Sequence, residues 1–570
     1  MDEKLSQEIR KIALQNASEH NGQTREKIVL ARILGSHPDL RNKIKNLSRD
    51  VSEIINVVNK LSIEEQRSKI EQEFPDLLKA KPKQEIEKTI LPPLEEAKNG
   101  MVVTRFPPEP NGYPHIGHAK AAIIDEEYAK MYGGKMILRF DDTNPANERM
   151  EYYAAIKVGL DWLGIKYDKI KNTSDDLELI YDKGLHMIKS GQAYVCTCKA
   201  ETVSENRKEK KPCKCRSIDQ KQTVDRWEKM FEKYKPGEAI VRFRGNMNSE
   251  NTVMRDPVLF RIIDSSHALL GNKYRVWPGY DFATAIEDSV DGITHALRTK
   301  EYELRNELYY AILDALQMRK PKVLEFSRLE FEGMPVSKRV LKQLIDEGKI
   351  PDYEDPRIPT LEGLKRRGIL PDAIRKFVLS LGFTKADTTA PFDVLESFNR
   401  KMVDSKSIRL NMVKEPVKLI VSKIPFDSVT ISNHPTVDMG KRKVVIDGNF
   451  YISKKDANEL KVGSQIRLMN LGNVSITKSS VDLEGEFIDD NVKSELPKIQ
   501  WVPQKSAQKI SIIIPGILFI NDNFNENSLE ITEGYTEDYY SNLKVGDEIQ
   551  FIRFGYCRKD SATQVIFTHK

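Results

Sequence analysis

Apolar residues near the start of the chain recur every three or four positions, with Lys and Glu between them. Ile55, Val58 and Leu61 show this spacing, which is typical of amphipathic helices that bury one face. Past residue 98 the pattern changes to short apolar runs that alternate with longer helical ones, as in βαβ units built on a parallel sheet. The sequence therefore predicts N-terminal helices followed by a doubly wound α/β domain.

The same patterns place the elements of the later regions. The predicted elements of the α/β domain are strand 101–106, helix 116–132, strand 135–140, helix 151–163, apolar runs 280–286 and 293–297, and helix 301–317. A Cys-bearing, Lys-rich insert interrupts this domain at 192–257, and helices dominate 362–410. After Val413 short segments of alternating apolar and polar residues are separated by turn residues, which favours β-barrels.

These changes of pattern divide the chain into regions. A chain of 570 residues is too long for one hydrophobic core, which rarely grows past about 250–300 residues. Three prolines mark 81–93 as the linker after the N-terminal helices. The predicted regions are a helical N-terminal extension at 1–97, the first half of a Rossmann-like doubly wound domain at 98–191, an inserted domain at 192–270, the second half of the doubly wound domain at 271–348, a helical connecting domain at 349–412 and a β-barrel region at 413–570.

Composition adds exclusions. Lys and Arg number 90 against 85 for Asp and Glu, a net charge of +5, so an anionic partner must be bound by local basic patches. The most apolar stretch, 512–520, contains Pro515 and Gly516 and is far shorter than the roughly 20 residues of a membrane helix. No secretory signal opens the chain, and five Cys are too few for a disulfide scaffold. We therefore expect a cytoplasmic protein that spans no membrane.

The most specific segment runs from Arg105 to His118 and reads RFPPEPNGYPHIGH. It lies at the end of a predicted strand and opens a helix, so free backbone amides and the helix dipole favour an anion there. His115 and His118 are three residues apart and share a helical face, where both imidazoles can contact one phosphate. Gly117 has no side chain, which lets a flat base approach the backbone.

This segment resembles the HIGH signature of class I aminoacyl-tRNA synthetases, in the form found in their glutamyl and glutaminyl members. The resemblance covers roughly residues 98–420, and the C-terminal strands and N-terminal helices are similar to the archaeal and eukaryotic branch. It implies an acceptor-stem-binding role for the insert and anticodon binding by the β-barrel region. The further matching segments, in order, are 138–145 (LRFDDTNP), 253–259 (VMRDPVL), 280–282 (YDF), 291–295 (DGITH), 325–329 (EFSRL) and 355–360 (DPRIPT).

A second signature of the family, Lys-Met-Ser-Lys-Ser, has a degenerate counterpart at 335–339 (PVSKR), in which the first Lys is missing. A loop Lys can stabilise the departing phosphates more in the transition state than in the ground state. The resemblance implies catalytic roles for His115, His118 and Lys338, with Mg²⁺ accompanying ATP. It also implies ATP contacts for Pro108, Glu109, Pro110, Asn111, Gly112, Gly117, Ser337 and Arg339.

The identity of the amino acid follows from charge. A side-chain carboxylate removed from water needs a guanidinium partner, because a buried unpaired ion costs several kcal/mol. Arg298, at the end of a predicted strand, is the candidate, whereas glutaminyl relatives resemble it there but hold a neutral residue. The resemblance implies that Arg105, Asp141, Tyr280 and Thr284 complete a glutamate pocket.

Two Cys-x-Cys pairs lie in the insert, Cys196 with Cys198 and Cys213 with Cys215. Four thiolates can close a tetrahedral structural zinc site, and family relatives show a similar cluster. Four free thiols or a redox pair is the alternative. Basic residues around the second pair either contact tRNA phosphates or form an ordinary solvated face.

Together these features favour glutamate-tRNA ligase activity, as the resemblance implies, with ATP, L-glutamate and tRNA(Glu) as substrates. Charging of tRNA(Gln) stays open, because the sequence does not place the anticodon contacts. A glutaminyl-tRNA synthetase and a non-catalytic RNA-binding scaffold are the alternatives. We expect a monomer whose N-terminal region is either a packing appendage or a surface for protein contacts.

Overall fold

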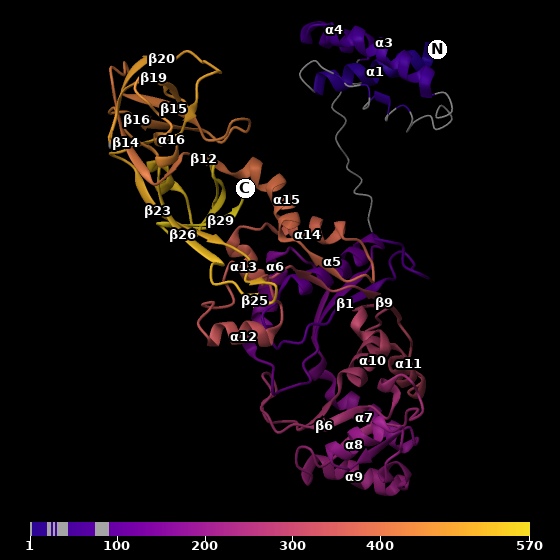
Figure 1. Ribbon diagram of the computed structural model, residues 1–570. Coiled ribbons are helices and arrows are strands. Elements are labelled where there is room, and N and C mark those ends of the chain that lie inside the picture. The colour runs from indigo at the N-terminus through magenta and orange to yellow at the C-terminus, as the bar shows by residue number, and fades with distance from the viewer. Residues whose placement is uncertain are drawn as a thin grey trace. The chain divides into compact units, whose positions relative to one another are not determined.

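The computed structural model describes residues 3–19, 24, 26, 29, 30, 33, 44–74, 91–480 and 482–570. The chain divides into two compact units, residues 1–89 and 90–570, shown in Figure 1. Residues 81–90 of the predicted linker lie outside the described residues. No helix in the described part of the chain combines the length and the apolar character needed to cross a membrane.

The described part of the N-terminal unit contains the predicted helices: α1 (Glu3–Glu19), α3 (Ile44–Asn59) and α4 (Ile63–Glu73). Apolar side chains at helical spacing, such as Val51, Ile55 and Val58, are buried together with those of α1. Ser62 caps α4 and forms a capping box with Glu65, which satisfies backbone amides that the first turn leaves free. The helical N-terminal prediction is confirmed for these residues.

A parallel sheet begins the second unit. Strands β1 (Val103–Phe106), β2 (Lys135–Phe140) and β3 (Lys169–Asn172) pair in parallel, with α5 (Ile116–Met131) and α6 (Met150–Trp162) as crossovers. Strands β8 (His295–Thr299) and β9 (Lys322–Phe326) form a second parallel pair. The Thr294 amide donates to the Val103 carbonyl at 2.9 Å, which places β8 beside β1.

The three-stranded sheet β3-β2-β1 and the pair β8-β9 are thus joined at β1 and β8, which gives the spatial order β3-β2-β1-β8-β9. The chain winds one way from β1 to β3 and the other way from β8 to β9, so the switch point lies between β1 and β8. In doubly wound sheets the crevice outside this point binds ligands. The prediction of a Rossmann-like doubly wound domain is confirmed.

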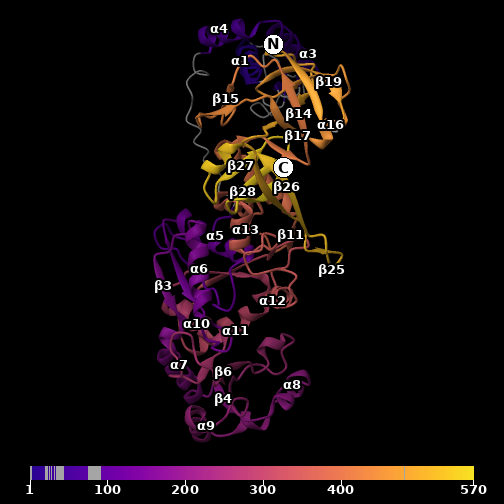
Figure 2. The same ribbon diagram turned by 90° about the vertical axis from the view of Figure 1, so that its left-hand side faces the viewer.

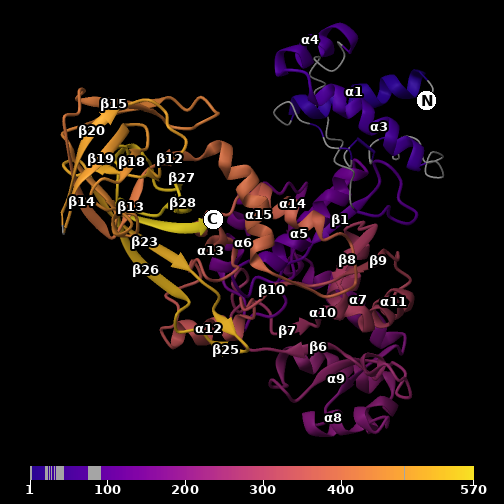
Figure 3. The ribbon, with the colours of Figure 1, turned by 45° about the horizontal axis from the view of Figure 1, so that its top comes forward.

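Different helices cover the two faces of the sheet, as the alternation of side chains in a strand requires. Thr104 donates its hydroxyl proton to the Asp125 carbonyl of α5. The next residue, Arg105, points to the other face and pairs with Asp288 of α10 (Tyr280–Val290). Figure 3 shows α5 and α10 beside the strands β1 and β8.

The insert folds around four antiparallel strands. These are β4 (Ala193–Cys196), β5 (Ile240–Phe243), β6 (Val258–Ile262) and β7 (Val276–Pro278). Their core includes Trp227, Phe260 and Trp277 and continues into α10, so the insert packs directly against the second half of the doubly wound domain. The helices packed with these strands are α7 (Leu177–Lys189), α8 (Ala200–Lys208), α9 (Gln220–Glu232) and α11 (Asn306–Ala315).

The helix predicted at 301–317 is wrong in its first turns. Lys300–Arg305 form a 3₁₀ helix, and α11 begins only at Asn306. Glu301 and Tyr302 line a cavity at the carboxyl ends of β1 and β8. The centroid of the Tyr302 ring lies 5.1 Å from that of the Tyr280 ring. The chain therefore enters the helix in a conformation that presents these side chains to the cavity.

Helices connect the doubly wound domain to the C-terminal strands, as predicted. They are α12 (Lys338–Asp346), α13 (Leu361–Arg367), α14 (Pro371–Ser380) and α15 (Phe392–Val403), with the short strands β10 (Leu329–Phe331) and β11 (Thr388–Ala390) paired in parallel. Gly368 ends α13 in the left-handed region at φ 89°, where glycine is favoured.

Two seven-stranded sheets follow, and Figure 2 shows their strands in orange and yellow. In the first sheet the edge strands β12 (Ile408–Leu410) and β13 (Met412–Lys414) are separated only by Asn411. The other strands are β23 (Gln508–Pro515), β26 (Leu529–Thr536), β27 (Glu548–Phe551), β28 (Gly555–Lys559) and β29 (Gln564–His569). Consecutive edge strands bring the ends of a sheet together, which supports the β-barrel prediction broadly.

The second sheet has the same property, because its edges β21 (Lys498–Ile499) and β22 (Val502–Pro503) are neighbours in the chain. Its core contains Phe450, Ile466 and Trp501. The other strands are β14 (Pro416–Ser422), β17 (Asn449–Ser453), β18 (Gln465–Leu468), β19 (Gly472–Ser479) and β20 (Leu483–Asp489), with β15 (Ser428–Ser432), β16 (Lys441–Val445) and the helix α16 (Lys454–Asn458) beside them.

A hairpin of the first barrel-like sheet reaches the segment before α12. It contains β24 (Phe519–Ile520) and β25 (Asn523–Phe524), and the Phe519 amide donates to the Gly333 carbonyl at 3.0 Å. Leu518 of the hairpin is buried with Leu341 and Leu344 of α12. The C-terminal strands thus contact the loop that carries the second signature.

We expect Gly333→Ala to lower the free energy of unfolding by about 2 kcal/mol, because a side chain in the left-handed region is strained. Gly333 has φ 63°, and a Cβ there would overlap Ile517 and the Phe519 carbonyl. Urea denaturation measures the change. Gly348→Ala is the control, since Gly348 has φ 69° with open space around it. Equal losses for both variants would show that the hairpin contact adds nothing.

Candidate active site

A cavity of about 820 Å³ lies at the carboxyl ends of β1 and β8. Its walls come from β1, the start of α5, the loop after β2, the start of α10, the end of β8 and the segment before α12. The sequence-predicted residues that line it are Arg105, Pro108, Glu109, Asn111, His115, Gly117, His118, Asp141, Tyr280, Thr284, Arg298 and Ser337. Pro110, Gly112, Lys338 and Arg339 are not among the lining residues.

Backbone hydrogen bonds to the segment 355–361 hold the start of α5 in place. The Ile116 amide donates to the Pro359 carbonyl, and the Leu361 amide donates to the Pro114 carbonyl, both at 2.9 Å. His115 is the N-cap residue of the helix. The two histidines are therefore held at a helix N-terminus, where the helix dipole favours anions.

Hydrogen bonds to the backbone fix the tautomer of both imidazoles. The Gly117 amide donates to Nδ1 of His115 at 3.1 Å, and the His115 amide donates to Nδ1 of His118 at 3.2 Å. Since each Nδ1 accepts, the proton of each neutral ring lies on Nε2. The ring centroids are 4.1 Å apart, so the pair offers two Nε2–H donors to a phosphate in the cavity.

Gly117 has a second role that the sequence did not indicate. A Cβ at this position would lie 2.9 Å from Cε1 and 3.1 Å from Nδ1 of His115. Any side chain there would push the imidazole out of place. The glycine is thus required by the histidine as well as by close approach of a ligand.

Burial keeps both histidines neutral near pH 7. It lowers the pKa of His118 to about 4 and, together with His118 and Arg328, lowers the pKa of His115 well below its usual value. The unfolded chain therefore binds more protons than the folded chain below a pH of about 6.5, so the free energy of unfolding falls as pH drops toward about 4.

This difference predicts a pH-dependent stability with a defined sign. The unfolding midpoint is lower at about pH 5 than at about pH 7, and His118→Ala reduces that difference because it removes one buried imidazole. Calorimetry of both proteins at the two pH values measures the effect. An unchanged difference in the variant would mean that His118 is protonated in the folded protein.

The two signature segments meet at Lys338, although this residue lies outside the cavity lining. Lys338 is the first residue of α12, and its ammonium donates to the Asn111 carbonyl. Its Nζ lies 5.3 Å from the centroid of the Tyr152 ring. Lys338 and Arg339 are exposed, so the cation stands at the mouth of the site beside the Pro-rich turn.

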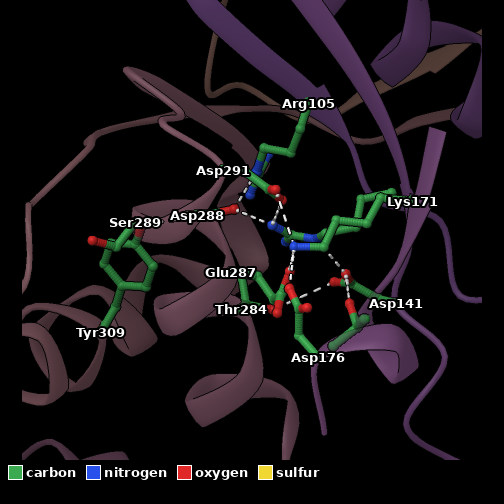
Figure 4. Close-up of polar contacts among 12 residues, drawn as sticks. Arg105, Asp141, Lys171, Asp176, Thr284, Glu287, Asp288, Ser289, Asp291 and Tyr309 are labelled. Carbon is green, nitrogen blue, oxygen red and sulfur yellow. Dashed lines mark hydrogen bonds and ion pairs between the residues drawn. The ribbon is translucent and has the colours of Figure 1, made fainter. Parts of the chain in front are cut away.

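A buried ion-pair network forms the floor on the α10 side (Figure 4). Asp288 is at its centre and receives three guanidinium groups. Arg105 Nε lies 2.9 Å from Oδ1, Arg139 Nη1 also 2.9 Å from Oδ1, and Arg298 Nη2 3.5 Å from Oδ2. Despite burial, these cations hold the pKa of Asp288 below its usual value, so the carboxylate stays charged and orients all three.

Two guanidinium groups keep donors for a ligand. Arg105 and Arg298 line the cavity, and Arg105 Nη2 and Arg298 Nε are buried without a hydrogen-bond partner in the described part of the chain. Arg298 also lies over the Tyr309 ring at 4.1 Å. Buried donors are nearly always paired, and a carboxylate bound in the cavity would supply acceptors for the two guanidinium groups.

Asp141, Thr284 and Tyr280 lie beside this network, and the structure brings all three to the cavity. Asp141 Oδ1 accepts from Arg139 and Thr173 at 3.0 Å, and Oδ2 accepts from Thr284 at 3.4 Å. Tyr280 opens α10 and lines the same cavity. A carboxylate and guanidinium groups that line the same cavity suit a zwitterionic amino acid with a second acidic group.

Sequence reasoning missed several contributors. Asp288 and Tyr309 hold the arginines, and Lys120 donates to the Ser327 carbonyl and hydroxyl at 2.6 and 3.0 Å. Burial lowers the pKa of Lys120 to about 8. A signal was present for Asp288, because an acidic residue between apolar positions of α10 has to be paired when buried.

The four cysteines of the insert come together. Their sulfur atoms all lie within 4.8 Å of one another, with 3.8 Å between Cys196 and Cys213 and between Cys198 and Cys215. These separations are far longer than a disulfide bond of about 2.05 Å, and all four are free thiols. Guanidinium groups lie close, with Arg242 3.7 Å from Cys213 and Arg226 3.5 Å from Cys215.

Three family models match consecutive parts of the chain. Residues 101–405 match "tRNA synthetases class I (E and Q), catalytic domain". Residues 407–496 and 498–560 match two models, each described as "tRNA synthetases class I (E and Q), anti-codon binding domain". The first match contains the cavity and the cysteine cluster, and the other two cover the C-terminal sheets.

Similar proteins carry one activity in their names. The glutamate-tRNA ligase of Nitrosopumilus maritimus (strain SCM1) is 62% identical over 570 residues, which is 100% of both chains. That of Cenarchaeum symbiosum (strain A) is 56% identical over 565 residues, 99% of each chain. The solved structure of a glutamate tRNA ligase from Elizabethkingia meningosepticum, in complex with its amino acid, covers 53% of this chain and 70% of that chain at 21% identity and a TM-score of 0.40.

Proposed function

The chain belongs to the class I tRNA synthetases of the E and Q group, and we propose that it is a glutamate-tRNA ligase of the archaeal type. In the first step the α-carboxylate of glutamate attacks the α-phosphorus of ATP, and pyrophosphate leaves. In the second step a ribose hydroxyl at the 3′ end of tRNA attacks the acyl carbon of glutamyl-adenylate, and AMP leaves. No bond to the protein forms, so the site acts by positioning and electrostatics.

The choice of glutamate rests on the unpaired donors of Arg105 and Arg298. Both guanidinium groups are buried and paired with Asp288, and both residues line the cavity. A carboxylate satisfies them with charge-assisted hydrogen bonds. A neutral amide would contact the same guanidinium groups without the assistance of a negative charge, so its hydrogen bonds would be weaker. Asp141 and Tyr280 then receive the α-ammonium group.

ATP is proposed to lie over the start of α5. The Nε2–H groups of His115 and His118 donate to its phosphates, and Gly117 leaves space for the base. Lys338 contacts the same Pro-rich turn by donating to the Asn111 carbonyl. From there its ammonium group can bind the pyrophosphate as it leaves. Enzymes of this family use ATP with Mg²⁺, an ion that needs only one or two protein carboxylates besides the phosphates. Glu109 lines the cavity beside Asn111 and fits that need.

tRNA is the third substrate, and the two C-terminal sheets match anticodon-binding domains. We propose that these sheets read tRNA(Glu) and that the insert holds the acceptor end. Charging of tRNA(Gln), a monomeric state and protein contacts of the N-terminal unit stay predictions. The glutaminyl alternative is less supported, because Arg298 and the similar proteins favour glutamate.

The experiment that tests the function measures tRNA-dependent pyrophosphate exchange and charging with purified chain. Glutamate and glutamine are supplied separately, each with transcribed tRNA(Glu) or tRNA(Gln). We expect exchange with glutamate and charging of tRNA(Glu). Exchange with glutamine alone would show a glutaminyl-tRNA synthetase, and no exchange with either would favour the scaffold alternative.

We also propose that the four insert cysteines hold one structural zinc ion. A tetrahedral shell with Zn–S bonds of about 2.3 Å requires S···S separations of about 3.8 Å, and two separations have this value. Arg226 and Arg242 offset the negative charge of four thiolates. The ion would tie the start of α8 to the 213–215 turn and leave no open coordination position, so its role is structural.

Cys213→Ser is expected to reduce the metal content from about one zinc per chain to near none, because three thiolates bind far more weakly than four. Elemental analysis of the purified protein measures the content. Cys557→Ser is the matched control, since Cys557 is buried in the first barrel-like sheet and should leave zinc unchanged. Wild-type protein that contains no zinc would refute the site.

A further inference from the structure

The loop after β2, residues 141–149, links several parts of the cavity wall. Asp141, Thr143 and Asn144 line the cavity. The Asp141 amide donates to the Pro108 carbonyl at 3.1 Å, and the Arg149 amide donates to the Pro110 carbonyl at 3.2 Å. The loop is thus bonded to the Pro-rich turn of the histidine signature, and a shift of the loop would disturb both substrate pockets.

Glu148 holds this loop from inside. Its Oε1 accepts the Asn144 amide at 2.6 Å, and its side chain is fully buried. A buried carboxylate needs a donor on each oxygen, because an unpaired charged atom is costly. The second oxygen, Oε2, lies 3.2 Å from Nε2 of His267, a residue of the insert.

The protonation of His267 is determined by its neighbours. Nδ1 accepts the backbone amides of Leu269 and Leu270, each at 3.2 Å. Nε2 lies 3.1 Å from the Asp142 carbonyl, which can only accept. The ring therefore carries its proton on Nε2 and donates it to the Asp142 carbonyl, and the same Nε2 is in polar contact with Glu148 Oε2. Stacking on Trp277, with centroids 5.0 Å apart and planes inclined by 21°, fixes the ring orientation.

We propose that His267 is a positioning residue of the ligation reaction, which holds the loop 141–149 in its cavity-lining shape through Glu148. This inference rests on the proposed function. The Asp142 carboxylate does not depend on His267 in the same way, because Tyr153 and Ser174 already donate to it at 2.7–2.8 Å. Glu148 Oε2 has no hydrogen-bond donor among the described residues, and its contact with His267 Nε2 at 3.2 Å supplies the positive end of an N–H dipole instead.

His267 lies where the insert contacts the cavity-lining loop 141–149. It lies between β6 and β7 of the insert, and Arg261 of β6 also reaches the loop by donating to the Thr143 carbonyl at 3.3 Å. The proposed acceptor-binding insert therefore contacts the wall of the amino-acid and ATP pockets through one imidazole and one guanidinium. Docking of the acceptor end can bias the loop through these contacts.

Two variants separate the positioning role from a packing role. His267→Asn offers a carbonyl oxygen near the place of Nδ1, which preserves the turn at Leu269 and Leu270, but its amide does not reach Glu148. His267→Gln reaches Glu148 with an amide donor. We expect kcat/KM for glutamate in tRNA-dependent exchange to fall about ten- to a hundred-fold in the Asn variant, as for misplacements of about 1 Å, and to stay near wild type in the Gln variant.

Double variants that combine Glu148→Gln with a substitution of His267 test whether His267 acts through Glu148. If His267 acts through Glu148, the loss caused by His267→Asn is smaller in the Glu148→Gln background, because neighbouring residues are coupled. Additive losses overturn the proposal. Equal activity of the Asn and Gln variants also overturns it, as does a loss that only follows the unfolding temperature.

ATP affinity, measured by calorimetry on the full chain without tRNA or glutamate, distinguishes this inference from the proposed function. A wild type that binds ATP but does not activate glutamate refutes the ligase function. The ATP affinity of the Asn variant still tests the loop. Weaker binding in the Asn variant than in the Gln variant supports the positioning role, and equal binding overturns it.

Discussion

Replacing Arg298 by Gln lowers kcat/KM for glutamate by about two to three and a half orders of magnitude. Loss of one partner of a buried charge pair costs about 3–5 kcal/mol, and 1.4 kcal/mol is a factor of ten. In the variant the substrate carboxylate would keep Arg105 but lose the guanidinium of Arg298, a residue that lines the cavity and whose Nε has no partner in the described part of the chain. Glutamate-dependent pyrophosphate exchange with tRNA measures the change.

The fold should tolerate this substitution, because Asp288 keeps ion pairs with Arg105 and Arg139 at 2.9 Å. Arg298→Lys is the matched control. It keeps the charge but lacks the planar fork, so it should recover only part of the lost rate. A Gln variant with the wild-type kcat/KM for glutamate would place the side-chain carboxylate elsewhere in the cavity.

Replacing His118 by Ala lowers kcat of the exchange reaction by about two to three orders of magnitude, the usual effect of losing one fixed donor to a developing negative charge. The lost donor is Nε2–H, whose direction is set by the bond from the His115 amide to Nδ1. Stability falls as well, by about 1 kcal/mol, because that amide loses its acceptor at the helix N-terminus. Single-turnover kinetics at saturating ATP measure the chemical step.

The variants His118→Asn and His118→Gln separate the effect on stability from the effect on kcat. His118→Asn can accept near the place of Nδ1 and should restore stability without restoring kcat. His118→Gln carries a donor closer to the place of Nε2 and should recover part of kcat. If Asn and Gln were equally active, the distal donor would have no part in the reaction, and the helix N-terminus alone would bind the phosphates.

The elements that carry the chemistry could be predicted from sequence because their signals are local. Strand β2 coincides with the predicted 135–140, and α5 starts at Ile116 as predicted. Each signal depends on the periodicity of apolar residues or on a helix start next to a Pro-rich turn. For the same reason the histidine signature and Arg298 were placed on the correct elements and meet in one cavity.

What the sequence did not indicate are contacts between distant segments. Asp288 binds three arginines that come from β1, β2 and β8, and His267 reaches Glu148 from another domain. No spacing rule links such residues, because the tertiary fold alone brings them together. The 3₁₀ turns at 300–305 were missed for a similar reason, since the cavity determines the conformation of Tyr302 rather than its local propensity.

The closure of the first C-terminal sheet has a consequence for synthesis on the ribosome. Strand β12 pairs with β27, and β29 lies between β28 and β23 in the middle of the sheet. The residues of the second sheet lie between β13 and β23 in the chain. This sheet can therefore form while β27, β28 and β29 are still in the exit tunnel. Thr568 donates to the Arg367 carbonyl, and Asn399 donates to His569. A nascent chain that stops a few residues short would therefore lack both a central strand and the contacts that join that strand to α13 and α15.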